Sequence, residues 1–517
     1  MSNSILKLQN GSDIRGTALD SVPGEKINLT PRIASQIGAS FGRWLAKKSG
    51  KNINNLKICI GRDPRISGKI LSEALILGIK SCNIEAFDAG LASTPAMFMS
   101  CVDERFNFDG AVMVTASHLP SNRNGFKFFT PFGGLDSNDI KDILIDVKEE
   151  STIPDKKQNY EHVPLMKAYS SHLRDIILEG INEYGLKDLS GMKIVVDAGN
   201  GSGGFFANDV LLPLGADISG SQFLEPDGEF PNHVPNPEDT IAMKSISDAV
   251  KMVNADLGII FDTDVDRSAA VGKFGKPIQR NEIIALAAAI GSVKHPGGTV
   301  VTDSITSNEL TDYLENALGL KHLRYKRGYK NVINKAKELH KEDAFLAIET
   351  SGHAAYSDNH YLDDGAYLAC LIVIEAAHLK IEGRDILSLI SDMKSPAESK
   401  EFRFKIFEDL ISKDSLAASS NVTEFSDYAD IAIDNMRKWA IETDGLSVVT
   451  PNYEGVRVNY NILNEDSGIK SKGWFLLRKS LHDPVMPLNI ESDTDGGISE
   501  VLSMIKLFLS QYKALKI

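Results

Sequence analysis

The chain has 517 residues, of which 42% are hydrophobic and 24% are charged, and its formal net charge is −14. Because a single hydrophobic core stops growing near about 250–300 residues, this length predicts several domains. The acidic balance argues against non-specific binding to nucleic acid or to an anionic membrane as the main role, but it leaves room for a local basic pocket.

Four cysteines, at 59, 82, 101 and 370, are scattered without CxxC spacing. This is typical of a reducing compartment, and it argues against a disulfide framework or a zinc knuckle. No apolar run approaches the roughly 20 residues that a membrane-spanning helix needs, and the first residues have neither a signal-peptide core nor an Arg-rich transit pattern. We therefore expect a cytoplasmic location, with organellar import left open.

Apolar, strand-like runs that end in Gly-rich or acidic loops recur along most of the chain, and amphipathic stretches separate them. Such runs occupy 56–63, 84–90, 108–117, 191–204, 255–267, 297–302 and 345–358. This alternation predicts α/β domains, in which ligands bind at the carboxyl ends of the strands. The end of the chain is α+β in character instead, with helices expected over 427–442 and 497–512 and strands over 446–451, 455–463 and 473–480.

Asp262, Asp264 and Asp266 alternate directly after an apolar strand. Three carboxylates packed so closely repel one another unless a cation neutralises them, and hard oxygen ligands suit Mg²⁺ or Ca²⁺. An EF-hand loop is excluded, because Arg267 stands where that loop needs Gly. Two alternatives stay open: the DxD nucleophile of a haloacid-dehalogenase-type phosphatase, and a solvated acidic turn with Arg267 as its counter-ion.

Ser117 and His118 follow another buried strand, and Lys127 comes ten residues after Ser117. Taken alone, the pair is weak support for a hydrolase, since no GxSxG elbow is present, and an ordinary strand-to-turn junction would give the same pattern. Combined with a metal loop it indicates a serine that carries a phosphoryl group, with Lys127 as a candidate general acid or base.

Several basic residues sit in loops that follow strands. Arg15 lies between glycine-flanked turns, and Arg62 and Arg65 follow a strand. Arginine forks bind phosphate oxygens bidentately, although surface ion pairs are the default interpretation of all three. A compact basic turn contains Lys326, and Arg478 begins a basic strand end, which again suits either a phosphate or an ordinary surface turn.

Glu349, Ser351 and His353 flank a glycine directly after an apolar strand. Short polar side chains with a carboxylate and an imidazole could read the hydroxyls of a sugar. A structural helix cap is the alternative interpretation.

Five of these loops, in order, resemble the α-D-phosphohexomutases, the family that includes phosphoglucomutase and phosphomannomutase. The strongest parts are Thr115–His118 with Asn124–Lys127, which resembles the family's phosphoserine loop, and Asp262–Arg267, which resembles its Mg²⁺ loop. Glu349–His353 resembles the sugar-specificity loop, and the stretches "DAGNG" and "FPNHVPNPE" are also similar to the family's second domain. The resemblance covers essentially the whole chain.

The resemblance implies three related α/β domains with mixed sheets and a smaller α+β domain around a central cleft. With polar or Pro-containing joints near residues 155, 276 and 395, we expect domains over 1–160, 161–278, 279–396 and 397–517. A monomer or homodimer acting on a phosphorylated hexose is expected, with no nucleic-acid or membrane partner.

The resemblance also implies the chemistry of an intramolecular phosphotransferase. Phosphorylated Ser117 would donate its phosphoryl group to a hexose phosphate, and the hexose 1,6-bisphosphate formed would turn over and return the other phosphate. One Mg²⁺ would bind the three aspartates and the Ser117 phosphate, with glucose 1,6-bisphosphate as activator. Lys127 and His118 would be the acid/base candidates, and Arg15 and Arg267 the electrostatic stabilisers.

The roles of the remaining site residues are also carried over from the family. Glu349, Ser351, His353 and Lys326 would bind the sugar phosphate, and Arg478 and Ser480 would hold its non-reacting phosphate.

The sequence departs from the family pattern in three loops. Leu119 replaces an Asn, and Thr263 and Val265 replace glycines, without removing a ligand. The C-terminal phosphate loop keeps Arg478 and Ser480 but lacks the family's Gly, Thr and second Arg; Lys479 and His482 are possible substitutes.

If the altered C-terminal loop holds the non-reacting phosphate more weakly, the enzyme could release the bisphosphate before it returns its phosphate. The alternative function is therefore a glucose-1,6-bisphosphate synthase that uses a sugar-bisphosphate donor. A non-catalytic regulatory relative and a DxD phosphatase are further alternatives. The choice between glucose and mannose stays open.

Overall fold

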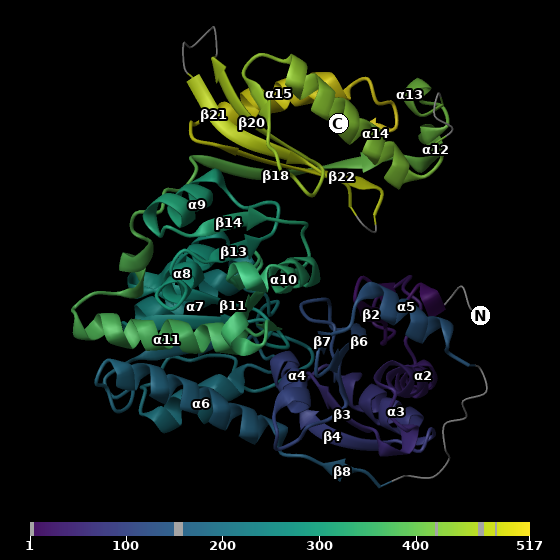
Figure 1. Cartoon of the computed structure of the whole chain (residues 1–517), viewed down its shortest axis with the longest axis vertical. Coiled ribbons are helices and arrows are strands. Elements are labelled where there is room, and N and C mark those ends of the chain that lie inside the picture. Colours follow the sequence, from purple (N-terminus) through teal and green to yellow (C-terminus); the bar gives the residue numbers. More distant parts are fainter. Residues whose placement is uncertain (1–4, 149–158, 419–421, 464–469, 481–482) are drawn as a thin grey trace. The chain divides into compact units, whose positions relative to one another are not determined.

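A computed structural model describes residues 5–148, 159–418, 422–463, 470–480 and 483–517 of the chain (Figure 1). The chain divides into two compact units. Unit 1 contains Met1–Val293 and Phe345–Ser391, and unit 2 contains Lys294–Ala344 and Asp392–Ile517. Within the described ranges, no helix has both the length and the apolar character needed to cross a membrane.

The N-terminal sheet of unit 1 is mixed. Its described strands have the order β1-β2-β6-β5-β3-β4-β8, with β7 beside β6. Strand β3 is parallel to β4 and β5, whereas β6 is antiparallel to β5 and β2. The strands are β1 (Gln9–Asn10), β2 (Asp13–Thr17), β3 (Lys57–Arg62), β4 (Glu85–Leu91), β5 (Gly110–Val114), β6 (Arg123–Thr130), β7 (Gly133–Gly134) and β8 (Glu161–His162).

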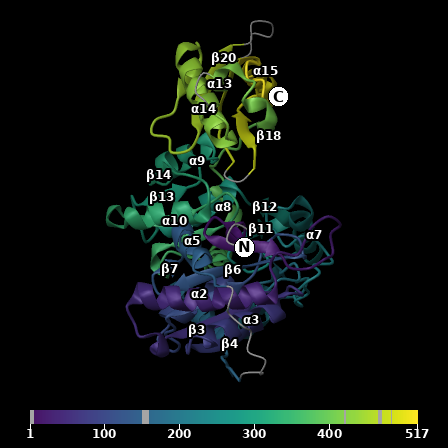
Figure 2. The ribbon, with the colours of Figure 1, turned by 90° about the vertical axis from the view of Figure 1, so that its right-hand side faces the viewer.

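Helices cover this sheet, and Figure 2 shows two of them, α2 and α3, beside β3 and β4. The helices are α2 (Pro31–Ser49), α3 (Gly68–Lys80), α4 (Thr94–Val102) and α5 (Ser137–Ile145). Local sequence fixes the ends of α2: the Thr30 side chain accepts a hydrogen bond from Ile33 N, Pro31 occupies the first position, and Gly50 ends the helix in the left-handed conformation.

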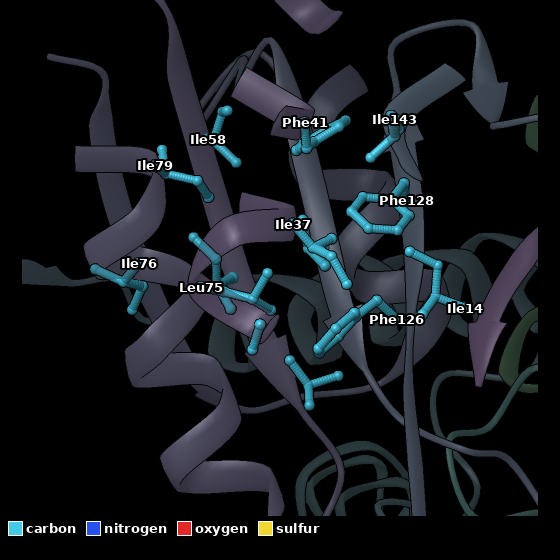
Figure 3. Close-up of a cluster of buried hydrophobic side chains, with 14 of the residues drawn as sticks. Ile14, Ile37, Phe41, Ile58, Leu75, Ile76, Ile79, Phe126, Phe128 and Ile143 are labelled. Carbon is cyan, nitrogen blue, oxygen red and sulfur yellow. The ribbon is translucent and has the colours of Figure 1, made fainter. Parts of the chain in front are cut away.

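The core of this domain explains how Lys127 is aimed. Figure 3 shows Phe126 and Phe128 of β6 in the buried cluster, where the Phe41 ring lies 4.8 Å from that of Phe128. Because side chains alternate along a strand, Lys127 must point to the opposite face of the sheet. The two phenylalanines therefore anchor β6 and direct the intervening lysine away from the core.

The second α/β domain of unit 1 contains a sheet whose described strands have the order β12-β11-β10-β9. Strand β9 is parallel to β10, and β10 and β11 form an antiparallel hairpin around the loop with the three aspartates. The elements are β9 (Ile194–Asp197), β10 (Leu257–Phe261), β11 (Ser268–Gly272), β12 (Lys276–Ile278), α6 (Leu165–Glu183) and α7 (Thr240–Val253). The apolar face of α7 packs on β10 and β11 through Met243, Ile246 and Val250.

The remaining strands of unit 1 form an antiparallel meander of β15, β16 and β17. The elements are β15 (Ala344–Ile348), β16 (Ala354–Tyr356), β17 (Leu362–Asp363), α8 (Asn281–Ser292) and α11 (Gly365–Ile381). The Asp364 side chain begins α11 by accepting a hydrogen bond from Tyr367 N. The turn between β15 and β16 lies next to the β10–β11 hairpin, because Arg267 and His353 form a β-bridge.

Unit 2 combines a parallel strand pair with an antiparallel sheet. Strand β13 is parallel to β14, and the described C-terminal strands have the order β19-β20-β21-β22-β18-β23. The strands are β13 (Thr299–Thr302), β14 (Lys321–Arg324), β18 (Glu398–Ile406), β19 (Leu446–Val448), β20 (Val456–Leu463), β21 (Lys470–Leu477), β22 (Val485–Ser492) and β23 (Leu515–Lys516). The helices are α9 (Asn308–Asp312), α10 (Tyr329–Glu338), α12 (Glu408–Ile411), α13 (Ser415–Ala418), α14 (Phe425–Glu442) and α15 (Gly497–Leu509).

The expected fold class is confirmed, with α/β domains, mixed sheets and a β-rich C-terminal domain. Several strands were not predicted from the sequence, and two long ones among them are β18 and β22. The stretch near residue 395 leads into the nine-residue strand β18, whose many charged residues obscure its strand pattern. No strand was predicted over β22, which contains Pro487, and proline is rare inside strands. The domain boundaries stay a prediction, and the joint near residue 155 lies outside the described residues.

Candidate active site

Ser117 lies at the carboxyl end of β5 in a strained turn. Its φ is 49°, a left-handed conformation that is uncommon for a residue other than glycine. The Ser117 amide donates to Thr115 Oγ1 at 2.9 Å. Such a conformation persists only where the surroundings hold it, and it is enriched at functional sites.

The three aspartates follow β10 and are buried. Their ligand atoms lie within 4.8 Å of one another. Ser117 Oγ donates to Asp262 Oδ2 at 3.0 Å, so the serine from one domain and the acidic loop from another meet in unit 1. The sequence prediction that these two loops share one site agrees with this geometry.

Two cations lie against the three carboxylates. Lys127 Nζ pairs with Asp264 at 3.0 Å and also with Asp266. Arg267 pairs with Asp262 at 3.1 Å. If all five groups carry their formal charges, the three carboxylates and the two cations leave the cluster with a net charge of −1. Burial and the neighbouring Asp266 carboxylate raise the pKa of Asp262, as expected where like charges are crowded in a site of low dielectric.

The cluster fits a divalent cation. Asp264 Oδ1 and Asp266 Oδ1 are buried, and neither has a hydrogen-bond partner among the described residues. Leaving buried carboxylate oxygens unsatisfied is costly, and all-oxygen ligands suit Mg²⁺. Asp264 Oδ2 is oriented by Thr94 Oγ1 at 2.6 Å. The donor set therefore suits a metal ion that binds Asp262, Asp264 and Asp266.

Val265 shows what the departure from the family's glycine means structurally. Its φ is 69°, and a β-branched residue in this region is a genuine outlier. The loop thus keeps the backbone conformation that glycine adopts without strain. The Val265 carbonyl accepts a hydrogen bond from Gly365 N at 3.1 Å, which ties the loop to the start of α11.

His118 extends the cluster on the serine side. Its Nδ1 lies 2.8 Å from Arg267 Nη2 and 3.3 Å from Ser117 Oγ. Because a guanidinium can only donate, His118 Nδ1 is the acceptor in that contact. Burial and the charge of Arg267 lower the pKa of His118 to about 3, so the ring is neutral.

The predicted sugar loop adjoins the acidic loop. Glu349 N donates to the His353 carbonyl at 3.0 Å, and Gly352 N donates to the Glu349 carbonyl at 3.0 Å. His353 Nδ1 lies 2.6 Å from Asp363 Oδ2 and 4.0 Å from Asp266 Oδ1. Although burial disfavours its charge, these carboxylates raise the pKa of His353 to about 9. The buried Ser351 Oγ has no hydrogen-bond partner within the described part of the chain.

Two of the arginines contact the serine loop through its backbone. Arg15 pairs with Asp13 at 2.7 Å and donates to the Thr115 carbonyl. The Arg65 side chain is fully buried against Asp63, so the default interpretation of Arg65 as a surface ion pair is wrong. Sequence reasoning could not reveal this, because the carbonyls that bind Arg65 lie more than 50 positions away.

The predicted residues of the C-terminal phosphate loop lie in unit 2. Arg478 is buried, and its Nη2 lies 3.5 Å from Glu401. Burial and the charge of Arg327 lower the pKa of Arg478. Ser480 N donates to the Val485 carbonyl at 3.0 Å.

Two other basic residues of unit 2 differ in their surroundings. Lys326 is exposed. Lys479 Nζ pairs instead with Asp430 at 2.6 Å and Ser426 at 3.0 Å. His482, the other suggested substitute for the missing arginine, lies outside the described residues.

Three contacts of this site were missed from the sequence. Thr94 orients Asp264, Asp363 binds His353, and Asn236 Oδ1 accepts from Arg267 Nη1 at 3.2 Å. Of these three residues, only Asn236 could have been suspected from the sequence, because it lies in the stretch "FPNHVPNPE" that resembles the family's second domain.

Comparison with known families matches three successive segments of the chain. Residues 7–153, 167–275 and 279–394 match "Phosphoglucomutase/phosphomannomutase, alpha/beta/alpha" domains I, II and III, respectively. The chain belongs to the phosphoglucomutase/phosphomannomutase family. Membership is consistent with a site in which a serine loop, an acidic loop and a polar loop converge.

Relatives and solved structures agree with this family membership. A phosphomannomutase/phosphoglucomutase of Pseudomonas aeruginosa is 30% identical over 97% of this chain and 94% of its own length. A phosphomannomutase of Escherichia coli is 27% identical over 96% of this chain and 97% of its own length. A family structure from Burkholderia thailandensis has a TM-score of 0.75 at 23% identity, covering 99% of both chains, and therefore supports the fold.

Proposed function

We propose that the protein is a phosphohexomutase that interconverts hexose 1-phosphate and hexose 6-phosphate through a phosphorylated Ser117. The observation that carries this proposal is the 3.0 Å contact between Ser117 Oγ and Asp262 in the buried acidic cluster. A phosphoryl group on a serine needs a neutralising cation nearby, and these carboxylates can hold one.

The first half-reaction transfers the phosphoryl group from Ser117 to the free hydroxyl of the substrate. The bond between Ser117 Oγ and phosphorus breaks, a bond from the sugar oxygen to phosphorus forms, and the hydroxyl proton passes to a base. Mg²⁺ held by Asp262, Asp264 and Asp266 would offset the charge of the transferring group. The hexose 1,6-bisphosphate then turns over, and its other phosphate returns to Ser117.

Two basic side chains have distinct roles in this scheme. His118 is the candidate proton acceptor, with Nδ1 lying 3.3 Å from Ser117 Oγ. Because Nδ1 accepts a hydrogen bond from Arg267, it must exchange that bond for the substrate hydroxyl before it can take the proton. Lys127 is an ammonium held between two carboxylates and serves as a proton donor. Arg267 Nη2 lies 3.2 Å from Ser117 Oγ, where its charge stabilises the transferring group.

The residues for substrate recognition are assigned within each unit. In unit 1, Glu349, Ser351 and His353 bind sugar hydroxyls beside the acidic loop. In unit 2, Arg478 and Ser480 bind the non-reacting phosphate, and Lys326 adds positive charge. Glucose 1,6-bisphosphate would phosphorylate Ser117 and thus activate the enzyme.

The experiment measures formation of glucose 6-phosphate from glucose 1-phosphate, and the same conversion for mannose, with Mg²⁺ and a trace of glucose 1,6-bisphosphate. The wild type should turn over, and Ser117→Ala should lose activity by several orders of magnitude. Ser49→Ala, which truncates an exposed serine at the end of α2 in unit 1, is the control and should stay active. Full activity of Ser117→Ala would overturn the assignment.

One observation favours a second candidate, a glucose-1,6-bisphosphate synthase. Lys479 pairs with Asp430 at 2.6 Å, which weakens the case that it replaces the family's second phosphate-binding arginine. A weaker clamp would release the bisphosphate before it returns its phosphate. Product analysis separates the two candidates, because a synthase accumulates hexose 1,6-bisphosphate when a sugar-bisphosphate donor is supplied in excess.

A further inference from the structure

Arg65 occupies an unusual place beside the nucleophile loop. Its guanidinium has five N–H donors, and the described contacts engage all three of its nitrogens. Nε donates to Asp63 Oδ2 at 3.2 Å. Nη1 donates to the carbonyls of Pro120 at 2.7 Å and Arg123 at 3.1 Å, and Nη2 donates to the carbonyls of Ser117 at 2.5 Å and Leu119 at 2.6 Å.

This pattern is inconsistent with a role in binding phosphate. The Arg65 side chain is 0% exposed, and the five acceptors above account for its full donor capacity. A substrate phosphate would have to displace backbone carbonyls of the very loop that carries the nucleophile. Arg65 therefore acts on the loop rather than on the substrate.

Two further contacts fix the guanidinium in place. Asp63 N donates to the Val114 carbonyl at 3.1 Å, and Asp63 Oδ1 accepts from Arg65 N at 3.0 Å, so the acid is tied to the end of β5. On the other side, the Phe230 ring of the second domain lies 5.2 Å from the guanidinium carbon. A cation over an aromatic face is stabilised most when it is desolvated.

The space around the Phe230 segment is closely filled. A Cβ on Gly228 would lie 2.4 Å from the Pro64 carbonyl oxygen. The 228–230 segment thus packs directly against the turn that carries Arg65.

We infer that Arg65 is a positioning residue that holds the 117–123 loop closed around its guanidinium, and so keeps Ser117 Oγ aimed at Asp262 during phosphoryl transfer. The inference rests on the proposed role of Ser117 as phosphoryl carrier. It accounts for the left-handed Ser117 backbone, since a strained turn needs an external constraint and four carbonyl contacts supply one.

The test compares Arg65→Lys with Arg123→Lys. A lysine keeps the charge but cannot reproduce a planar fork that binds four carbonyls. Arg123 is a matched control because its side chain is 36% exposed and pairs with Glu25, while its carbonyl stays in place after substitution. Both variants are assayed as full chains with Mg²⁺.

Arg65→Lys should lower kcat by about 10- to 100-fold, the range that a displacement near 1 Å produces. The KM for glucose 1-phosphate should change by less than about twofold, because the substrate contacts are intact. Arg123→Lys should match the wild type. A rise in KM with unchanged kcat would overturn the inference in favour of a binding role, and wild-type kinetics would overturn it altogether.

Hydrogen exchange of the 115–125 amides gives a readout that is independent of activity. Amide exchange here should be at least about tenfold faster in Arg65→Lys than in wild type, with exchange in unit 2 unchanged. If Arg65→Lys does not fold, Phe230→Leu removes the covering ring and should give a smaller increase confined to the same segment. Unchanged exchange in both variants would contradict the inference.

The two readouts separate failure of the inference from failure of the proposed function. If the wild type neither takes up phosphate nor interconverts hexose phosphates, the proposed function fails, while faster loop exchange in Arg65→Lys still supports the constraint on the loop. If the wild type is active and Arg65→Lys changes neither kcat nor exchange, the inference alone fails.

Discussion

Binding of Mg²⁺ should stabilise unit 1 by an amount that the acidic cluster determines. A ligand that binds only the folded state at 100 times its Kd raises the free energy of unfolding by about 2.7 kcal/mol. A change of 1 kcal/mol shifts the melting temperature by roughly 2–4 °C in domains of 150–250 residues, and by less in larger ones. Because unit 1 is larger than this range, we expect an increase of about 5 °C, the lower end, for the unfolding transition of unit 1. Differential scanning calorimetry with and without Mg²⁺ measures it.

Asp264→Asn should remove most of this stabilisation. Asp264 Oδ1 is one of the two buried carboxylate oxygens without a hydrogen-bond partner in the described structure. If losing this ligand weakens the site about 100-fold, the same Mg²⁺ concentration adds only about 0.4 kcal/mol. The substitution removes one of three like charges but also a partner of Lys127 at 3.0 Å, so the quantity to compare is the Mg²⁺-induced shift within each protein.

The matched control is Asp209→Asn, which neutralises an exposed aspartate of the same unit and should keep the full Mg²⁺ effect. Equal Mg²⁺ stabilisation of wild type and Asp264→Asn would refute the metal site, as would the absence of any effect in the wild type.

Three further predictions concern the core, pH and phosphate binding. Phe126→Ala should lower the free energy of unfolding by about 3–5 kcal/mol in urea denaturation, because Phe126 is 0% exposed; a loss below about 1 kcal/mol would contradict the described core. His233 contacts Asp197 at 3.1 Å, and although burial opposes it, this carboxylate raises the pKa of His233. The stabilisation from the charged pair is complete below about pH 6.5 and is lost as pH rises through the pKa of His233 in the folded protein. The melting temperatures of wild type and His233→Asn should therefore converge at alkaline pH. A difference that stays constant with pH would contradict the role of the His233–Asp197 pair. Arg478→Ala should raise the KM for glucose 1-phosphate about tenfold or more, whereas Lys479→Met should leave it within about twofold, and the opposite order would reverse our assignment.

The main loops of the site could be predicted because each follows an apolar strand. A loop at the carboxyl end of such a strand is where an α/β fold binds ligands. Strands β5 and β10 lie in different sheets, so the expectation that Ser117 and the Asp262–Asp266 loop share one site came from the family resemblance. Their chemistry was also local, since a serine near a lysine and three alternating aspartates are patterns within a few positions.

The supporting contacts could not be predicted, because they join residues that are distant in sequence. Thr94 and Asp264 lie 170 positions apart, and Arg65 lies 52 positions before the Ser117 carbonyl that it binds. No local pattern marks an arginine whose partners are backbone carbonyls, and the "GRDPR" turn is indistinguishable from a surface turn in sequence. The strand with Pro487 was hidden for a different reason, since a general propensity was overridden by its tertiary setting.

The most direct test of the account is the phosphorylation state of Ser117. Intact-mass and peptide analysis should be carried out on wild type and Ser117→Ala after incubation with glucose 1,6-bisphosphate and Mg²⁺. We expect the wild type to gain one phosphoryl group, located on Ser117 and removed again by glucose 1-phosphate, and the variant to gain none. A wild-type protein that takes up no phosphate, or takes it up at another residue, would contradict the central claim.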